Sequence, residues 1–213
     1  TGWNRRVSVS ADAAIGLAVS YDNGVTFERY GNGPVMAATL HEPFLVGDAF
    51  VAKYGSIYHM WYIFGVRWTL SSEEVQPDRV YKIAHATSED GITWKRDGRL
   101  LITDRRDADE CQALPTVIQL GKRYHMYFCH RAAHGFREDS DKAYRIGYAY
   151  SDDLVTWHRD DKLAGIDISE EGWDSQMQCY PHVFSCEEKT YMLYNGNEFG
   201  RHGFGLAELV EDA

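Results

Sequence analysis

The sequence lacks the features that would place it in a membrane or on a nucleic acid. None of its apolar runs approaches the roughly 18 residues that a membrane-spanning helix requires, so we expect no membrane span. The formal net charge is −10, from 22 basic and 32 acidic side chains. Nucleic-acid binding depends on clustered basic side chains, so we also expect no nucleic-acid partner.

Cysteine is scarce, and no two cysteines have Cys-x-x-Cys spacing. We interpret all four as reduced packing residues, with a Cys179–Cys186 disulfide as the alternative. We expect no metal ion and no cofactor. No Asn-x-Ser/Thr sequon is present, and we expect a cytoplasmic location. The chain starts at Thr1 without methionine, which leaves a removed signal peptide and secretion open.

Aromatic residues, in contrast, are abundant. They make up 14% of the chain, with Trp 6 and Tyr 14, which favours strands and carbohydrate-facing surfaces over helix bundles. The 213 residues are 44% hydrophobic, which suffices for one globular core. We therefore predict a single all-β domain over residues 1–213, with no helix.

The chain repeats one strand-turn-strand unit. Residues 50–62 read FVAKYGSIYHMWY, residues 116–128 read TVIQLGKRYHMYF, and residues 182–194 read HVFSCEEKTYMLY. The copies are about 65 residues apart, a period that indicates the blades of a β-propeller. The predicted units are residues 15–36, 43–103, 104–166 and 173–210, with an irregular segment over 1–14 and polar loops over 67–79 and 134–142.

A second motif closes each unit. Residues 20–27, SYDNGVTF, fit the Asp-box pattern S-x-D-x-G-x-T-[WF], and residues 88–94 and 151–157 fit a form shortened by one residue. A sialidase carries such motifs, but the sequence offers no cluster of three arginines for a sialic-acid carboxylate. A motif present in every blade cannot be one active site. We interpret Asp22, Asp90 and Asp153 as structural hydrogen-bond acceptors in hairpins.

The units amount to about three and a half blades, whereas closed propellers have at least four. We expect that one and a half blades precede Thr1 and that the full propeller has five. The alternative is a homo-oligomer, or a partner that supplies the missing strands, because open blades leave unpaired strand edges that invite pairing with another chain.

The first strand of each unit is predicted to line the central channel. In register, Asp48, Leu114 and Tyr180 are equivalent, and alternation predicts that Glu110, Gln112, Asp174 and Gln178 lie on the same face. Three acids would then meet at one mouth, which suits glycoside hydrolysis by a proton donor and a second carboxylate. The alternative is that each acid caps a turn at a solvated rim. Six residues are candidates for binding sugar hydroxyls: Gln112, Gln178, Tyr180, His182, His130 and Asn195.

The repeat, its Asp-box hairpins and the closing YNGNEFG at residues 194–200 resemble the five-bladed β-propeller glycoside hydrolase superfamily of arabinanases, xylosidases and invertases. Within that superfamily the sequence is similar, over nearly the whole chain, to uncharacterised propeller proteins encoded beside polysaccharide-biosynthesis genes. Catalytic members carry their acids as Asp-Pro, Arg-Asp-Pro and Glu-Cys-Pro. Here Ala49 follows Asp48, and Gln112 follows Glu110-Cys111.

This resemblance implies a glycoside hydrolase with a carbohydrate substrate. It implies Glu110, which Cys111 follows as in the Glu-Cys pair of the invertase-like enzymes, as the proton donor, with Asp48 or a residue absent from this sequence as its partner. If Asp48, Glu110 and Asp174 share one pocket, like charges so close together would raise the pKa of at least one of them, as a proton donor at neutral pH requires. A non-catalytic carbohydrate-binding or scaffolding propeller is the alternative function.

Overall fold

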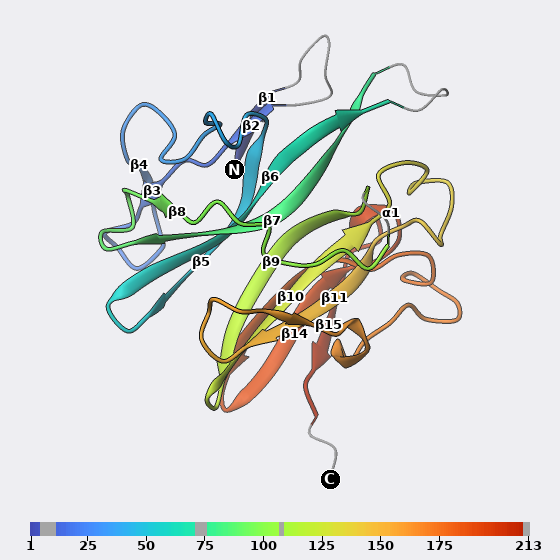
Figure 1. The fold of residues 1–213 in the computed structure, drawn as a ribbon. Coiled ribbons are helices and arrows are strands. Elements are labelled where there is room, and N and C mark those ends of the chain that lie inside the picture. Colours follow the sequence, from blue (N-terminus) through green and yellow to red (C-terminus); the bar gives the residue numbers. More distant parts are fainter. Residues whose placement is uncertain (5–11, 71–75, 107–108, 211–213) are drawn as a thin grey trace. The chain divides into compact units, whose positions relative to one another are not determined.

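The computed structural model describes residues 1–4, 12–70, 76–106 and 109–210, and its regular secondary structure is almost entirely antiparallel strand (Figure 1). It forms two compact units, Thr1–Arg99 and Leu100–Ala213. The predicted all-β fold class is confirmed, whereas the single domain and the number of blades stay predictions. In the described part of the chain, no helix has the length and apolar character needed to cross a membrane.

The described part of the first unit contains three sheets. The largest has four strands in chain order: β5 (Val46–Tyr54), β6 (Ile57–Thr69), β7 (Asp78–Ser88) and β8 (Lys95–Arg96). The predicted half unit forms a two-stranded sheet of β3 (Ala18–Val19) and β4 (Glu28–Arg29). An isolated bridge joins Ile15 to Met36 beside it. The third sheet pairs β1 (Gly2–Asn4) with β2 (Asp12–Ala14).

Two sheets, again with their strands in chain order, are found among the described residues of the second unit. One has four strands: β9 (Cys111–Leu120), β10 (Arg123–Arg131), β11 (Arg145–Ser151) and β12 (His158–Arg159). The other has three: β13 (Cys179–Cys186), β14 (Lys189–Asn195) and β15 (Phe204–Glu208). The repeated YHM residues lie in the second strand of their sheets, β6 and β10, so their predicted equivalence is confirmed.

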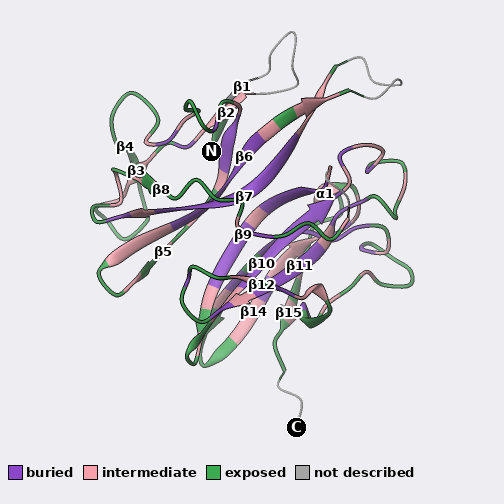
Figure 2. Ribbon diagram, viewed as in Figure 1, coloured by how far each residue is buried: buried purple, intermediate pink, exposed green. Residues whose placement is uncertain are grey.

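Alternation along the strands builds a core in each unit. In the first unit, one face of β6 and β7 buries large apolar residues of β6 against alanines of β7: Met60, Tyr62, Phe64, Ala84 and Ala86. In the second, a cluster joins the two sheets through Tyr127, Ile146, Tyr148, Ala164, Val183 and Met192. Figure 2 shows the buried residues concentrated in the middle strands and the exposed ones at the hairpin ends.

Short helical turns complete the architecture. A 3₁₀ turn, Asp161–Leu163, follows β12. A four-residue turn, α1 (Asn197–Gly200), contains Glu198 and Phe199 with positive φ of 52° and 60°, so it is not a regular helix. Among the described residues, the prediction that the fold contains no helix of substance is therefore confirmed.

Two local predictions were wrong. Residues 1–14 were expected to be irregular, yet β1 pairs with β2 through Gly2↔Ala14 and Asn4↔Asp12, while residues 5–11 lie outside the described part. The polar loop at 67–79 is shorter than expected, because β6 continues to Thr69 and β7 begins at Asp78. In both cases backbone pairing extends strands whose side chains show no clear alternation. Residues 71–75 are not described.

The four cysteines are free, as predicted: Cys111, Cys129 and Cys179 are buried and Cys186 is exposed. Burial raises the pKa of the Cys179 thiol to about 12, which makes this residue an unreactive packing group. No Cys179–Cys186 disulfide is formed.

Candidate functional site

The first strands of the three large sheets share one backbone irregularity. Each has a β-bulge, where its register with the second strand shifts. At these bulges Asp48, Leu114 and Tyr180 have φ of 52°, 47° and 61°. The sequence alignment makes the same three residues equivalent, so the structure confirms this register.

A left-handed backbone is costly for residues other than glycine, above all for bulky ones such as Leu114 and Tyr180. Asp48 tolerates this conformation better, because its short polar side chain can hydrogen-bond locally. Bulges redirect side chains and are frequent beside active sites. On these strands we therefore expect side chains that face a ligand at the three bulges.

Asp48 is half-buried at its bulge. Its backbone N–H donates to the Thr1 hydroxyl, with an N···O distance of 2.8 Å. It belongs to the first unit, whereas Glu110 and Asp174 belong to the second, so the convergence of the three acids stays a prediction.

Glu110 is fully buried, and both of its carboxylate oxygens are occupied. Arg159 donates to Oε1 at 2.6 Å, and the Gln112 amide donates to the same oxygen at 3.0 Å. The backbone N–H groups of Arg105 and Arg106 donate to Oε2 at 3.1 and 3.0 Å. This is an ionised carboxylate held by an arginine and three further donors.

The expected raised pKa of Glu110 is wrong. Burial alone would raise the pKa, but the hydrogen bond and charge of Arg159, together with Gln112, outweigh it and lower the pKa to about 2. His130 lies beside the pair, with its Nδ1 3.7 Å from Glu110 Oε2. Burial and the charge of Arg159 lower the pKa of His130 to about 4, so the imidazole is neutral at neutral pH.

Asp174 is also buried, but its partners are neutral. Its Oδ2 accepts hydrogen bonds from the Gln178 amide at 2.9 Å and the Tyr194 hydroxyl at 3.3 Å. The Trp173 ring stacks on Tyr194 with a centroid distance of 5.4 Å. The same Gln178 amide also donates to the Asp167 carbonyl at 2.9 Å.

The surroundings of Glu110 recur in the first unit. There the buried Glu42 accepts from the Tyr62 hydroxyl at 2.8 Å and pairs with Arg96. Arg96 lies 5.9 Å from the Tyr62 ring centroid, and Arg159 lies 5.1 Å from that of Phe128. Tyr62, Phe128 and Tyr194 hold the same place on the second strand of each sheet.

Each large sheet thus has a buried acid before its first strand: Glu42, Glu110 and Asp174. A feature present in every sheet is more easily explained by stability than by one active site. These contacts favour a structural role for Glu110 and Asp174, while their catalytic role stays a prediction that an activity measurement must decide.

The predicted sugar-binding residues differ in burial and in the residues that they contact. Gln112, Gln178 and His130 are buried beside the acids. The Oε1 atoms of both glutamines are buried without a hydrogen-bond partner among the described residues. His182 is exposed and stacks on Phe184, with ring centroids 6.2 Å apart.

Tyr180 and Asn195 lie near the α1 turn. The Tyr180 ring contacts Tyr144 and Phe199, at centroid distances of 5.9 and 6.4 Å. The Asn195 amide donates to the Phe199 carbonyl at 3.1 Å. Tyr144 is buried, whereas Tyr180 and Phe199 are half-buried, so two of these rings can offer part of their surface to a sugar ring. Of the three, only Tyr180 was predicted from the sequence.

The sequence analysis also missed Arg96 and Arg159. A signal was present, because each arginine follows the Asp-box tryptophan by two residues, in Trp94-Lys95-Arg96 and Trp157-His158-Arg159. Extending the repeat alignment by two residues would have shown these arginines as a recurring element.

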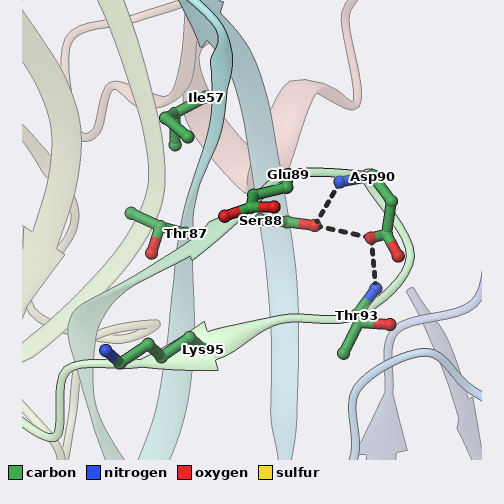
Figure 3. Close-up of a pocket in the computed structure, with 7 residues that line it drawn as sticks. All are labelled: Ile57, Thr87, Ser88, Glu89, Asp90, Thr93 and Lys95. Atoms are coloured by element: carbon green, nitrogen blue, oxygen red, sulfur yellow. Dashed lines mark hydrogen bonds between the residues drawn. The ribbon is translucent and has the colours of Figure 1, made fainter.

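The Asp-box hairpin of residues 88–94 forms part of a surface hollow of about 520 Å³ (Figure 3). Its residues are Ile57, Thr87, Ser88, Glu89, Asp90, Thr93 and Lys95. The Asp90 carboxylate accepts from the Ser88 hydroxyl at 2.8 Å and from the N–H groups of Ile92 and Thr93 at 2.8 and 2.7 Å. Asp22 and Asp153 have the same contacts in their own hairpins. These acids bind their own turns, which supports the structural interpretation.

Replacing Asp90 by alanine is expected to lower the melting temperature and to leave any carbohydrate binding unchanged. The turn amides keep the pKa of Asp90 below its usual range, so they bind the ionised carboxylate, and alanine leaves them without an acceptor. Thermal unfolding of Asp90→Ala and of the neighbouring exposed control Glu89→Ala tests this. Loss of binding at an unchanged melting temperature would assign Asp90 to a binding site instead.

No family model matches the sequence. Two uncharacterized proteins of Mycobacterium tuberculosis, from strains CDC 1551 / Oshkosh and ATCC 25618 / H37Rv, are each 36% identical to the chain over 209 residues. These matches cover 98% of this chain and 65% of each relative. The chain thus spans less than two thirds of the length of these relatives.

Solved glycoside hydrolases are similar in structure. A thermostable family-43 glycoside hydrolase has a TM-score of 0.70 at 16% identity, covering 93% of this chain and 64% of that chain. BT0996, solved in a complex with RGII, has a TM-score of 0.67 at 20% identity, covering 94% and 57%. The GH32 beta-fructofuranosidase BmSUC1 of Bombyx mori has a TM-score of 0.58 at 15% identity, covering 86% and 35%. At these identities the likeness shows the fold, and the predicted propeller-type fold of glycoside hydrolases is confirmed.

Proposed function

We propose that this protein acts on a carbohydrate as a glycoside hydrolase, with Asp48 as the carboxylate at its reaction centre. The observation that carries the proposal is the position of Asp48 at a bulge, with positive φ, in the first strand of its sheet, in a fold shared with solved glycoside hydrolases. Of the three predicted acids, Asp48 alone is half-buried, and Glu110 and Asp174 are buried.

Hydrolysis of a glycosidic bond needs two carboxyl groups. One protonates the leaving oxygen, and the other activates water or attacks the anomeric carbon. Glu110 is poorly suited to proton donation, because its pKa is about 2. We therefore rank Asp48 first and keep Glu110 and Asp174 as candidates for its partner.

The aromatic group of Tyr180, Tyr144 and Phe199 supports a carbohydrate ligand. Sugar rings present C–H faces that pack on aromatic rings, and a hydroxyl such as that of Tyr180 offers a hydrogen bond at the rim. Tyr180 also lies at a bulge, as Asp48 does. We propose that this group binds the glycan.

A second function, carbohydrate binding without catalysis, is favoured by one observation. The bulge positions equivalent to Asp48 hold Leu114 and Tyr180, neither of which is a carboxylate. A propeller that uses its inner strands only for binding would show this pattern.

Hydrolysis of a panel of aryl glycosides distinguishes the two functions. For a hydrolase we expect Asp48→Asn to lose at least about a thousandfold in kcat/KM without a change in melting temperature, which is the scale of one acid-base group plus its electrostatic effect. The control Asp152→Asn, whose carboxylate pairs with Arg123 on the surface, should keep full activity. Glycan binding without turnover by the unaltered protein would establish the binding function instead.

Glu110→Gln and Asp174→Asn complete the test of the predicted site. If their contacts are structural, both variants should lose thermal stability and keep kcat/KM below their melting temperatures. Loss of turnover at unchanged stability in either variant would assign it the second carboxylate.

A further inference from the structure

An exposed arginine lies beside the aromatic group of Tyr180, Tyr144 and Phe199 in the second unit. The Cζ atom of Arg137 is 5.6 Å from the centroid of the Phe199 ring and 4.2 Å from that of Phe136. Phe199 in turn stacks on Tyr180, with 28° between the two ring planes. A cation therefore lies next to the rings that are proposed to bind the glycan.

Arg137 differs from the neighbouring cations in its partners. Lys142, on the same loop, lies 3.3 Å from the Asp139 carboxylate, and Arg201, directly after α1, lies 2.6 Å from that of Glu198. Among the described residues, the Arg137 guanidinium contacts aromatic rings and forms no ion pair or hydrogen bond. Its five N–H donors are therefore available to a ligand.

The rings and the cation come from two segments, one from each sheet of the second unit. Arg137 and Phe136 belong to the loop between β10 and β11, whereas Phe199 belongs to α1, between β14 and β15. The Phe136 and Phe199 rings meet at a centroid distance of 6.2 Å, and Figure 1 shows the loop, in yellow, beside α1. The group is thus built where two described sheets meet, away from any outer strand edge.

The loop that carries Arg137 is held in place from two sides. Arg106 donates to the Asp141 carbonyl at 2.7 Å, and Arg145 donates to the Ser140 carbonyl at 2.9 Å. A loop that is already ordered loses little conformational entropy when a ligand binds, so it can place a side chain for recognition.

The turn that carries Phe199 is also fixed, in a strained conformation. Glu198 and Phe199 have φ of 52° and 60°, a region that is costly for large side chains and recurs where ligands are held. Asn197 anchors the turn, because its Oδ1 accepts from the Gln176 N–H at 2.8 Å. These bonds keep the Phe199 ring in its stacked position on Tyr180.

A guanidinium beside aromatic rings suits a sugar that carries a carboxylate. The rings pack on the C–H face of the sugar. The planar fork of the guanidinium donates two parallel hydrogen bonds to the two oxygens of one carboxylate, and its single positive charge balances the single negative charge. A neutral sugar would use the rings alone.

We propose that the glycan bound at this group contains a uronic acid, whose ring packs on Tyr180 and Phe199 and whose carboxylate accepts hydrogen bonds from Arg137. Binding of a carbohydrate at these rings is part of the proposed function, on which this assignment rests. The net charge of −10 disfavours an acidic ligand elsewhere on the protein, so its recognition depends on this local cation.

Isothermal titration calorimetry with short oligomers of galacturonic acid and of glucuronic acid tests the assignment. The methyl ester of each oligomer is the matched neutral probe, because it keeps the sugar ring and removes the charge. The unaltered protein should bind at least one acid about tenfold more tightly than its ester, which corresponds to about 1.4 kcal/mol. Equal binding of each acid and its ester, or binding of no probe, would overturn the proposal.

Arg137→Gln removes the charge and keeps a polar side chain. This variant should bring the affinity for the acid down to that for the ester, at an unchanged melting temperature. Arg201→Ala is the matched control, because it also removes an exposed arginine next to Phe199, and it should keep the preference for the acid. If both variants lose the preference equally, the attraction comes from net charge and the role of Arg137 is wrong.

Tyr180→Leu tests the contribution of the rings. Leucine is found at the equivalent bulge, where Leu114 has φ of 47°, so it is tolerated in the backbone conformation of Tyr180. The variant should weaken binding of the acid and of the ester by the same factor, because packing on a ring does not depend on the charge of the sugar. Unchanged binding of both probes would overturn the placement of the sugar on Tyr180.

Turnover of the aryl glycoside panel separates this proposal from the hydrolase function. Selective binding of an acid without turnover of any substrate would support the uronic-acid site and contradict hydrolysis. Turnover by a protein that shows no preference for either acid would support hydrolysis and overturn the uronic-acid site.

Discussion

Replacing Arg159 by alanine is expected to destabilise the protein by about 3–5 kcal/mol, because it leaves the buried carboxylate of Glu110 without its cation. Arg159 also donates to Asp161 at 2.8 Å and to the Thr103 carbonyl at 2.7 Å. The loss therefore reaches three acceptors, of which Glu110 is fully buried. Urea unfolding of Arg159→Ala against the unaltered protein measures the effect.

Two further variants show whether the buried charge is the cause. Arg123→Ala removes an exposed ion pair with Asp152 and should change stability by less than about 1 kcal/mol. Adding Glu110→Gln to Arg159→Ala should recover part of the loss, since glutamine is neutral and can still accept from the Arg105 and Arg106 amides. If the double variant is less stable than Arg159→Ala by the full cost of Glu110→Gln, the two residues are uncoupled and this account is wrong.

Acid should destabilise the protein through Glu110 in a defined window of pH. The pKa of Glu110 is lowered from 4.5 to about 2 in the folded state, mainly because Arg159 outweighs the effect of burial. The ionised carboxylate therefore stabilises the fold at pH values above 4.5. This contribution, about 3 kcal/mol at 1.36 kcal/mol per unit, is lost as the pH falls toward 2.

The difference between the unaltered protein and Glu110→Gln isolates this contribution, because other carboxylates titrate in both. Unfolding free energies from pH 7 to pH 2.5 should converge only below about pH 4.5. His130 acts in a separate window: its pKa falls from 6.5 to about 4, so it costs stability as pH drops through that range. Parallel curves for the two proteins below pH 4.5 would show that Glu110 is not held as an ion pair.

Local patterns in the sequence predicted the elements of the fold. The repeated YHM segment predicted equivalent second strands, and these are β6 and β10. The Asp-box pattern predicted hairpins in which Asp90 binds its own turn. Both predictions depend on residues close together in the chain, so alternation and turn chemistry were sufficient.

The sequence predicted the candidate site only in part. Alignment predicted that Asp48, Leu114 and Tyr180 are equivalent, and the three bulges confirm it. The same alignment could not show that Glu110 is buried against Arg159, 49 residues away in the chain. From the sequence alone, neighbouring like charges and burial predicted a raised pKa for Glu110. In the structure, the contact with Arg159 lowers this pKa instead.

The sequence by itself determined that this chain forms repeated antiparallel sheets of a propeller-type fold, because strand alternation, turn residues and the period of the repeat are all local properties. Only the tertiary structure decided which acids are exposed and which are buried as hydrogen-bond acceptors. Glu42, Glu110 and Asp174 look like ordinary carboxylates in the sequence, and each becomes a buried acceptor once the second and fourth strands bring a tyrosine or an arginine to it. The charge state and exposure of a side chain depend on its neighbours in space, and for these residues those neighbours come from distant strands.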